Sequence, residues 1–463
     1  MTLIKSISGI RGTIGGEINN NLTPLDAVKF AAAYGTWLID RNKTKDKLCV
    51  VLGRDARISG KMISSLVSNT LVGLGINVID LGLSTTPTVE IAVPLEKAYG
   101  GIIITASHNP KQWNALKLLN EKGEFLNAIE GEKILTIAAN NDFNFAQVDD
   151  LGVYKKKKDY INKHIEEVLN LALVDVEVIK RAKFKIVVDA VNSTGGIAIP
   201  NLLKKLGVEC VELYCDPTGN FPHNPEPLAE HLTEISELVV KEKADLGIVV
   251  DPDVDRLAFV NEDGSMFGEE YTLVACADYV LSKTAGNTVS NLSSSRALRD
   301  ITKKHNGSYQ ASAVGEVNVV ELMKKNNAVI GGEGNGGIIY PASHYGRDSL
   351  VGVALFLTHL AKSKISCKEL RDSYPSYFMS KNKIALTPDL DVDLILNKMA
   401  EKYKNEDIIT IDGVKIDFAT EWVHLRKSNT EPIIRIYTES HSQNNADLLA
   451  ERIMKEITVI ANL

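Results

Sequence analysis

Two short motifs, far apart in the chain, hold side chains that could transfer a phosphoryl group. Thr105-Ala-Ser-His-Asn-Pro110 presents the hydroxyl of Ser107 directly after the apolar run Gly100–Ile104. Asp251-Pro-Asp-Val-Asp-Arg256 presents three carboxylates directly after another apolar run, Leu246–Val250. A hydroxyl can carry a phosphoryl group, and a cage of carboxylate oxygens suits Mg²⁺. The pair of motifs therefore predicts metal-assisted phosphoryl transfer.

Asp251, Asp253 and Asp255 are the expected metal ligands. Alternate residues of an extended loop project to one side, so three carboxylates would converge there and repel one another unless a cation is bound. An EF-hand is one alternative, because Glu262 stands at its twelfth position. Arg256, however, stands at the sixth position, where that loop needs glycine, and a strand-like run precedes the motif. A solvated acidic turn is the other alternative, which the apolar flanks disfavour.

Ser107 by itself is ordinary turn chemistry, and the Gly-x-Ser-x-Gly motif of hydrolases is absent from this segment. Ser107 becomes a candidate phosphoryl carrier only if the aspartate loop lies beside it in the fold. His108 is a further catalytic candidate. Neighbouring side chains of an extended segment point apart, so the sequence makes His108 a poor base for Ser107.

Two more loops could bind a phosphate and sugar hydroxyls. The first runs from Arg426 and offers guanidinium, hydroxyl and amide donors, which suit a phosphate dianion. Its expected phosphate ligands are Arg426, Ser428, Asn429, Thr430 and Arg435; a helix N-cap is the alternative. The second loop, Gly331–Gly337, lets the backbone approach a ligand while Glu333 and Asn335 contact hydroxyls. A plain flexible loop is the alternative there, and the glycine spacing does not fit a dinucleotide site.

Strand-like apolar runs that alternate with amphipathic helical stretches must position these loops. Successive rounds of the pattern begin at Leu48–Leu52, Phe184–Asp189 and Thr288–Leu292. Repeated units of this kind predict α/β layers with largely parallel sheets. The tail differs, because Ile408–Phe418 predicts a hairpin that turns at Asp412-Gly413, and Gln443–Ile460 predicts a closing helix. We expect a smaller α+β unit at the end of the chain.

Composition limits the class of protein. The chain of 463 residues is longer than a single hydrophobic core usually accommodates, which suggests several domains. A net charge of −7 argues against a general nucleic-acid binder, and no apolar stretch reaches membrane-spanning length or forms a signal-peptide core. The five scattered cysteines are typical of reduced thiols. We therefore expect a cytoplasmic enzyme that binds neither nucleic acid nor membranes.

Taken in this order, the four loops resemble those of the α-D-phosphohexomutase family, and the resemblance covers the whole chain. Further matching segments are Ser8-Gly-Ile-Arg-Gly12, Gly53-Arg-Asp-x-Arg57, Asn114-Ala-Leu-Lys117 and Asp216–Pro227. The resemblance implies three related α/β domains with mixed sheets and a smaller C-terminal α+β domain around a central cleft. The expected domains are 1–152 with the phosphoserine loop, 153–256 ending in the metal loop, 257–370 with the sugar loop and 371–463 with the phosphate loop.

The resemblance also implies an activity, the interconversion of a sugar 6-phosphate and a sugar 1-phosphate. Ser107 would be phosphorylated, and one Mg²⁺ per chain would bridge its phosphate and the three aspartates. A hexose 1,6-bisphosphate would serve as intermediate and activator. Lys117 and Arg11 are the implied groups for proton transfer and charge stabilisation, with Arg256 supporting; an arginine is a poor base, which favours Lys117. Sugar phosphates would be the partners of a monomer or homodimer.

The sugar loop departs from the common pattern of the family, Gly-Glu-x-Ser-Gly-His. This chain has Gly332-Glu-Gly-Asn-Gly-Gly337, so Asn335 replaces the serine and Gly337 the histidine. That version resembles a branch assigned to glucosamine 6-phosphate, and a phosphoglucomutase/phosphomannomutase of broad sugar specificity is the alternative. A serine phosphatase would need no second phosphate loop. A non-catalytic sugar-phosphate sensor would not need nucleophile, metal cage and base together.

Overall fold

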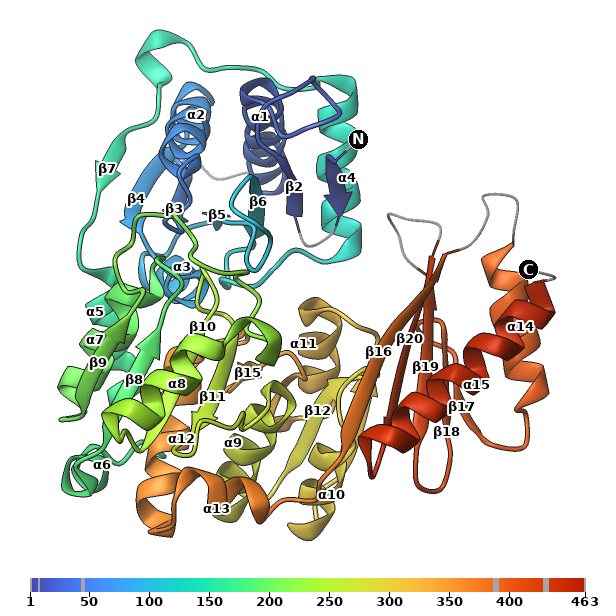
Figure 1. Cartoon of the computed structure of the whole chain (residues 1–463). Coiled ribbons are helices and arrows are strands. Elements are labelled where there is room, and N and C mark those ends of the chain that lie inside the picture. Colours follow the sequence, from blue (N-terminus) through green and yellow to red (C-terminus); the bar gives the residue numbers. More distant parts are fainter. Residues whose placement is uncertain (1, 7–8, 43–45, 386–390, 428–432, 462–463) are drawn as a thin grey trace.

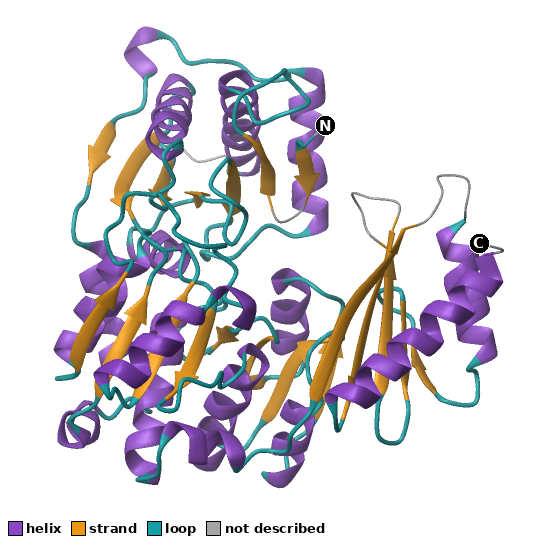
Figure 2. Ribbon diagram, viewed as in Figure 1, coloured by secondary structure: helices purple, strands orange, loops and turns teal. Residues whose placement is uncertain are grey.

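The computed structural model describes residues 2–6, 9–42, 46–385, 391–427 and 433–461. They form four β-sheets with helices packed against them, arranged as one unit at the top of Figure 1, two below it and one at the right. Figure 2 shows that the first three units mix helices and strands throughout, whereas the fourth is a sheet with helices on one side. No helix among the described residues is both long and apolar enough to span a membrane.

The first sheet has seven strands in the order β1-β2-β6-β5-β3-β4-β7. Its strands are β1 (Ile4–Ser6), β2 (Gly9–Thr13), β3 (Cys49–Arg54), β4 (Asn77–Leu83), β5 (Gly100–Ile104), β6 (Trp113–Leu119) and β7 (Tyr154–Lys156). Its helices are α1 (Pro24–Arg41), α2 (Gly60–Gly73), α3 (Thr86–Leu95), α4 (Ala128–Asn140) and the 3₁₀ turn Val148–Asp150. Helix α1 begins with a capping box in which Thr23 and Asp26 satisfy each other's backbone N–H groups.

The second sheet has the order β11-β10-β8-β9. The elements of this unit are α5 (Tyr160–Leu169), α6 (Val176–Ala182), β8 (Lys185–Asp189), α7 (Gly195–Lys205), β9 (Glu209–Leu213), the 3₁₀ turn Ala229–His231, α8 (Thr233–Glu242), β10 (Leu246–Val250) and β11 (Leu257–Asn261). Strand β11 pairs antiparallel with β10, so the expected domain border between residues 256 and 257 falls inside one hairpin. The domain borders stay a prediction.

The third sheet has the order β13-β12-β14-β15. This unit contains α9 (Glu269–Lys283), β12 (Asn287–Asn291), α10 (Ala297–Lys304), β13 (Tyr309–Ser312), α11 (Glu316–Lys325), β14 (Ala328–Glu333), β15 (Gly337–Ile339), α12 (Ser349–Ser363) and α13 (Cys367–Asp372). Helix α12 is buried along most of its length, and its side chains belong to one hydrophobic core shared with the second unit. Phe356 of α12 stacks on Phe259 of β11 with ring centroids 3.8 Å apart.

The fourth sheet, β16-β20-β19-β18-β17, is antiparallel throughout. Its unit contains β16 (Phe378–Ala385), α14 (Val392–Lys402), β17 (Asp407–Ile409), β18 (Val414–Asp417), β19 (Trp422–Lys427), β20 (Ile433–Ser440) and α15 (Gln443–Ala461). The expected hairpin is confirmed by the pairing of β17 with β18, and Gly413 has a φ of +74° at its turn. The closing helix is confirmed as α15.

The first three sheets share one four-strand unit. In each, the strands lie in the order second, first, third, fourth, and the fourth runs antiparallel to the third: β4-β3-β5-β6, β9-β8-β10-β11 and β13-β12-β14-β15. This confirms the predicted fold class of three related α/β units with mixed sheets and a smaller α+β unit. The loop from the third strand to the fourth holds Ser107 in the first unit, the three aspartates in the second and Asn335 in the third.

Candidate active site

Ser107 lies in the tight turn between β5 and β6, where it adopts a left-handed backbone conformation with φ +47°. Its Oγ donates a hydrogen bond of 2.6 Å to Asp251 Oδ2, which joins the first two units. Arg57 packs against this turn and is itself only 1% exposed. The Arg57 guanidinium donates to four backbone carbonyl oxygens, those of Ser107, Asn109, Pro110 and Trp113. The serine is therefore held rigidly against the aspartate loop.

Asp251, Asp253 and Asp255 are fully buried, and one oxygen of each lies within 4.8 Å of the others. The predicted convergence is confirmed, but the reason given for it is wrong, because the loop is a turn and not an extended segment. Asp251 Oδ1 accepts hydrogen bonds from the backbone N–H groups of Asp255 and Arg256, both at 3.1 Å. Val254 inside this turn has a φ of +65°.

Free carboxylate oxygens make this turn suitable for a cation. Neither Asp253 Oδ1 nor Asp255 Oδ1 has a hydrogen-bond partner among the described residues, although both are buried. Burial, with the charges of Asp253 and Asp255, raises the pKa of Asp251 well above its usual value. Buried acceptors without partners are costly, and hard oxygen ligands are what Mg²⁺ prefers. The donor set therefore fits a magnesium ion.

Lys117 on β6 reaches the same carboxylates. Its Nζ lies 2.8 Å from Asp253 Oδ2 and 3.3 Å from Asp255 Oδ2. Burial alone would lower the pKa of Lys117, but these two charges outweigh it and raise that pKa above its usual value. In this arrangement Lys117 is an ammonium ion, which stabilises negative charge but cannot accept a proton.

His108 lies closer to Ser107 than the sequence suggested. The left-handed turn at Ser107 brings His108 Nδ1 to 3.4 Å from Ser107 Oγ, whereas an extended segment would have separated the two side chains. Burial, with the nearby positive charge of Arg256, lowers the pKa of His108 well below its usual value. A neutral imidazole therefore stands beside the candidate nucleophile.

Three arginines from different units face one region. Burial and the charges of Arg435 and Arg256 lower the pKa of Arg11, so the Arg11 guanidinium is near enough to each of the other two to be repelled by it. Arg11 Nε and Arg256 Nε are buried without a hydrogen-bond partner among the described residues. Arg256 also pairs with Glu226 at 3.0 Å. Cations gathered in this way suit an anionic ligand such as phosphate.

Glu333 and Asn335 occupy the expected sugar loop, but Glu333 is already engaged. Its Oε1 accepts from Asn291 Nδ2 at 2.8 Å and from the backbone of Gly315 at 3.1 Å. Its Oε2 accepts from Arg347 at 2.8 Å. Within the described part of the chain, Asn335 Oδ1 accepts only a 3.2 Å bond from the backbone N–H of Gly337, so the Asn335 side chain is less engaged than that of Glu333.

Arg347 is the main residue that the sequence reasoning missed. This buried guanidinium joins carboxylates of the second and third units, with bonds to Asp255 at 2.7 Å, Glu316 at 2.9 Å and Glu333 at 2.8 Å. It links the metal loop to the sugar loop directly. A single arginine after Tyr345-Gly346 forms no motif with any residue nearby in sequence, so the sequence carried no signal for it.

The fourth loop is only partly described. Arg426 at the end of β19 forms an ion pair of 2.9 Å with Asp412 and stands opposite Arg435 of β20. Ser428, Asn429 and Thr430 lie outside the described residues. The two arginines are thus placed on neighbouring strands at the base of the expected phosphate loop.

Comparisons with known proteins give one family. Models described as phosphoglucomutase/phosphomannomutase alpha/beta/alpha domains I, II and III match residues 3–145, 159–264 and 268–377, and the model of the C-terminal domain matches residues 387–456. The chain is 37% identical over 441 residues to a phosphoglucomutase/phosphomannomutase of Thermococcus kodakarensis, covering 94% of this chain and 95% of that protein.

A second relative and a solved structure agree with that family. The chain is 33% identical over 457 residues to a phosphoglucosamine/phosphogalactosamine mutase of Sulfurisphaera tokodaii, covering 96% of this chain and 98% of that protein. The crystal structure of a phosphoglucomutase/phosphomannomutase family protein from Burkholderia thailandensis superimposes with a TM-score of 0.85 at 24% identity. That match covers 99% of this chain and 98% of the other, and it supports the fold of all four units.

Proposed function

The chain belongs to the phosphoglucomutase/phosphomannomutase family, and from that premise we propose that Ser107 carries the phosphoryl group in a sugar-phosphate mutase reaction. The reaction interconverts a sugar 6-phosphate and a sugar 1-phosphate. The observation that supports this role is the 2.6 Å contact between Ser107 Oγ and Asp251 Oδ2 at the rim of the buried aspartate turn.

We propose that Asp251, Asp253 and Asp255, together with an oxygen of phosphorylated Ser107, hold one Mg²⁺ per chain. Bound there, the ion would supply positive charge that offsets the charge on the moving phosphoryl group. Asp253→Asn should lower the rate and weaken its dependence on Mg²⁺ together, because Asp253 Oδ1 is one of the free ligand atoms. Initial rates over a range of Mg²⁺ concentrations check this, and an unchanged metal response would disprove the assignment.

The transfer itself needs one bond made and one broken. A substrate hydroxyl attacks the phosphorus on Ser107, the bond from phosphorus to Oγ breaks, and the hydroxyl proton passes to a base. The resulting hexose 1,6-bisphosphate turns around and returns its other phosphate to Ser107. Arg57 keeps the serine in place during both steps, while Arg426, Ser428, Asn429, Thr430 and Arg435 would hold the phosphate that is not reacting.

Lys117 is our proposed base, with Arg11 and Arg256 stabilising charge. It can accept a proton only after losing its own, and its pairing with Asp253 and Asp255 opposes that loss. His108 is the second candidate, because it is 3.4 Å from Ser107 Oγ and burial lowers its pKa. Replacing Lys117 by Met and His108 by Gln separately identifies the base, since only its loss should remove the acidic limb of the pH–rate profile.

We propose glucosamine 6-phosphate as the preferred substrate, with Glu333 and Asn335 reading the sugar. The name of the Sulfurisphaera tokodaii relative supports an amino sugar. The name of the Thermococcus kodakarensis relative, a phosphoglucomutase/phosphomannomutase, supports glucose and mannose phosphates instead. Initial rates on glucosamine 6-phosphate, glucose 1-phosphate and mannose 1-phosphate, with Mg²⁺ and a trace of hexose 1,6-bisphosphate, decide between them. A higher kcat/KM for glucosamine 6-phosphate is expected, and equal or lower values would favour the broad enzyme.

We further propose that the enzyme acts in the cytoplasm as a monomer or a homodimer. All five cysteines are free thiols, which supports a reducing compartment. Light scattering on the purified protein, with and without reducing agent, measures the oligomeric state.

A further inference from the structure

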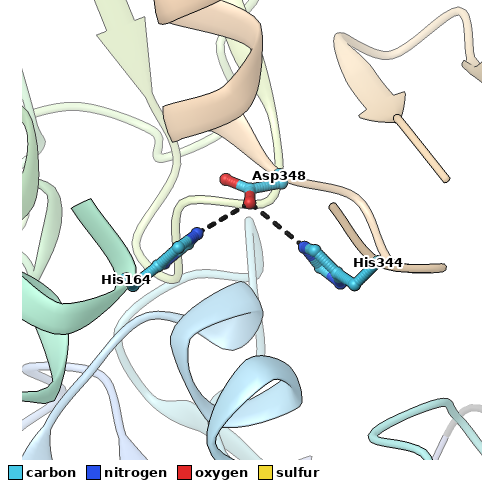
Figure 3. Close-up of side chains that lie close together, drawn as sticks. All are labelled: His164, His344 and Asp348. Atoms are coloured by element: carbon cyan, nitrogen blue, oxygen red, sulfur yellow. Dashed lines mark hydrogen bonds and ion pairs between the residues drawn. The ribbon is translucent and has the colours of Figure 1, made fainter. Parts of the chain in front are cut away.

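A second group of metal-binding side chains lies where the first three units meet. It consists of His164 on α5, His344 after β15 and Asp348, which caps the N-terminus of α12 (Figure 3). His164 and Asp348 are fully buried, and the side chain of His344 is 13% exposed. One ligand atom of each lies within 4.8 Å of the others. None of these residues belongs to the aspartate turn beside Ser107.

Both imidazoles point at one carboxylate oxygen, as Figure 3 shows. His164 Nε2 lies 2.8 Å and His344 Nε2 lies 3.1 Å from Asp348 Oδ2. Zinc binds nitrogen and oxygen ligands at about 2.1 Å, so ligand atoms of a tetrahedral site are about 3.4 Å apart. The observed spacings are a few tenths of an ångström shorter, and a small outward movement of the rings would admit the ion.

Side chains of helix α3 in the first unit lie beside the other ring nitrogen, Nδ1, of each histidine. His164 Nδ1 lies 2.9 Å from Thr88 Oγ1, and His344 Nδ1 lies 3.4 Å from Glu90 Oε2. A metal-binding histidine usually donates its second N–H to such a hydroxyl or carboxylate, which leaves the lone pair of Nε2 free for the metal. If both rings do so here, two Nε2 lone pairs face one carboxylate oxygen, an arrangement that a cation stabilises.

Glu90 is a further buried carboxylate beside this group. It is only 2% exposed, and its 3.4 Å contact with His344 Nδ1 is an ion-pair approach and not a hydrogen bond. Neither oxygen of Glu90, nor His344 Nδ1, has a hydrogen-bond partner among the described residues. A Cβ at Gly346 would lie 2.0 Å from Glu90 Oε2, so the backbone packs directly against this carboxylate. Burying a carboxylate without partners is costly. A divalent cation would offset the negative charge of Asp348 and would favour the ionised form of the neighbouring Glu90.

We propose that His164, His344 and Asp348 bind a divalent transition-metal ion of the zinc class, with Thr88 and Glu90 orienting the two imidazoles. Imidazole and carboxylate ligands suit zinc and its neighbours better than they suit Mg²⁺. The ion would link α3 of the first unit, α5 of the second and α12 of the third. Its role would be to fix these three units together, and it is independent of the transfer chemistry at Ser107.

Metal binding can be measured separately from the aspartate turn. The Asp253→Asn protein, kept in excess Mg²⁺, is treated with a chelator and then titrated with Co²⁺ or Zn²⁺. We expect one additional ion per chain, and with Co²⁺ the strong visible absorption of a tetrahedral site rather than the weak absorption of an octahedral one. Zinc should also raise the melting temperature of this protein.

Three variants in the same background localise the ion. His164→Gln should abolish both binding and the zinc-induced stabilisation. Asp348→Asn should do the same, although it retains Oδ1, which caps α12 by accepting from the backbone of Leu350 and Val351 at 2.8 and 3.2 Å. Glu90→Gln should weaken affinity about 10–100-fold.

His305→Gln is the matched control. His305 Nε2 makes a similar bond of 2.7 Å to Asp278, outside the three-unit junction, so this variant should bind zinc normally. Failure of the Asp253→Asn protein to bind stoichiometric zinc would overturn the proposal. Equal binding by His164→Gln and His305→Gln would also overturn it and would leave His164, Asp348 and His344 as a hydrogen-bonded network only.

Discussion

At the scale of single residues, buried charges hold the site together. Arg347 is the clearest case, because its guanidinium contacts three carboxylates, those of Asp255, Glu316 and Glu333. Burial alone would raise the pKa of Asp255, but Arg347 and Lys117 outweigh it and hold that pKa below its usual value. Since these carboxylates come from the metal loop and the sugar loop, Arg347 sets the distance between the two.

Removing the guanidinium should leave buried charge uncompensated. We predict that Arg347→Met lowers the free energy of unfolding by about 3–5 kcal/mol and raises KM for the sugar phosphate. Denaturant titration and steady-state kinetics measure the two effects. Arg299→Met is the control, because that arginine is 28% exposed in its ion pair with Asp417 and should contribute less than about 1 kcal/mol. Equal effects of the two substitutions would contradict the role assigned to Arg347.

Site residues that belong to a motif directly after an apolar run can be identified from the sequence. Site residues that belong to no local motif cannot. Ser107 and the aspartates were found because each group ends a strand-like segment. The sequence predicts that the side chains of Ser107 and His108 point apart, because a left-handed turn at a non-glycine residue such as Ser107 has no reliable sequence signature. Arg347 was missed because its three partners lie 14 to 92 residues away in the chain.

At the scale of elements, one loop position is used three times. The connection from the third to the fourth strand carries the serine in the first unit, the aspartates in the second and the sugar loop in the third. Repetition of one fold therefore supplies the candidate nucleophile, the metal ligands and the sugar-binding residues from equivalent loops. The alternation of strands and helices was predictable from apolar periodicity. The return of β11 onto β10 was not, because both strands are buried along their whole length and their residues give no sign of strand direction.

The clamp on the serine loop can be tested directly. We predict that Arg57→Lys lowers kcat by about 10²-fold with little change in KM, because a lysine cannot reach four carbonyl oxygens from one planar group. Steady-state kinetics on the purified variant measure this. Arg54→Lys is the control, since the Arg54 guanidinium donates to one carbonyl oxygen among the described residues, that of Asp55 at 3.0 Å. A loss in KM alone would indicate that Arg57 supports binding and not the reacting serine.

At the scale of the whole molecule, the fourth unit is attached through buried polar contacts with the third. Arg296 of the third unit pairs with Asp417, 121 residues further along the chain. Lys415 Nζ donates 2.8 Å to the backbone carbonyl of Leu292 and lies 4.1 Å above the ring of Trp422. No sequence pattern joins residues so far apart, so these particular contacts could not be predicted from the sequence.

The buried lysine makes this attachment dependent on pH. Burial lowers the pKa of Lys415 from 10.5 to about 8. Between these values the folded protein binds fewer protons at this site than the unfolded chain, so stability should increase with pH. We predict that the unfolding free energy of the wild type, relative to Lys415→Met, rises between pH 8 and 10.5 by up to about 1.4 kcal/mol per pH unit.

Urea unfolding of both proteins across this pH range measures the difference. Lys303→Met, a substitution at an exposed position, is the control and should follow the wild-type profile. A difference that stays constant with pH would show that Lys415 is not titrating in the folded protein.

Transfer of phosphate through Ser107 is the central claim, and labelling tests it most directly. The dephosphorylated enzyme is mixed with hexose 1,6-bisphosphate carrying a labelled phosphate, and the labelled peptide is identified by mass spectrometry. We predict one label per chain on Ser107, its loss on adding sugar monophosphate, and neither label nor turnover in folded Ser107→Ala. The control Ser84→Ala, at another buried serine, should behave as the wild type. Label on another residue, or near-normal mutase activity in Ser107→Ala, would contradict the mechanism.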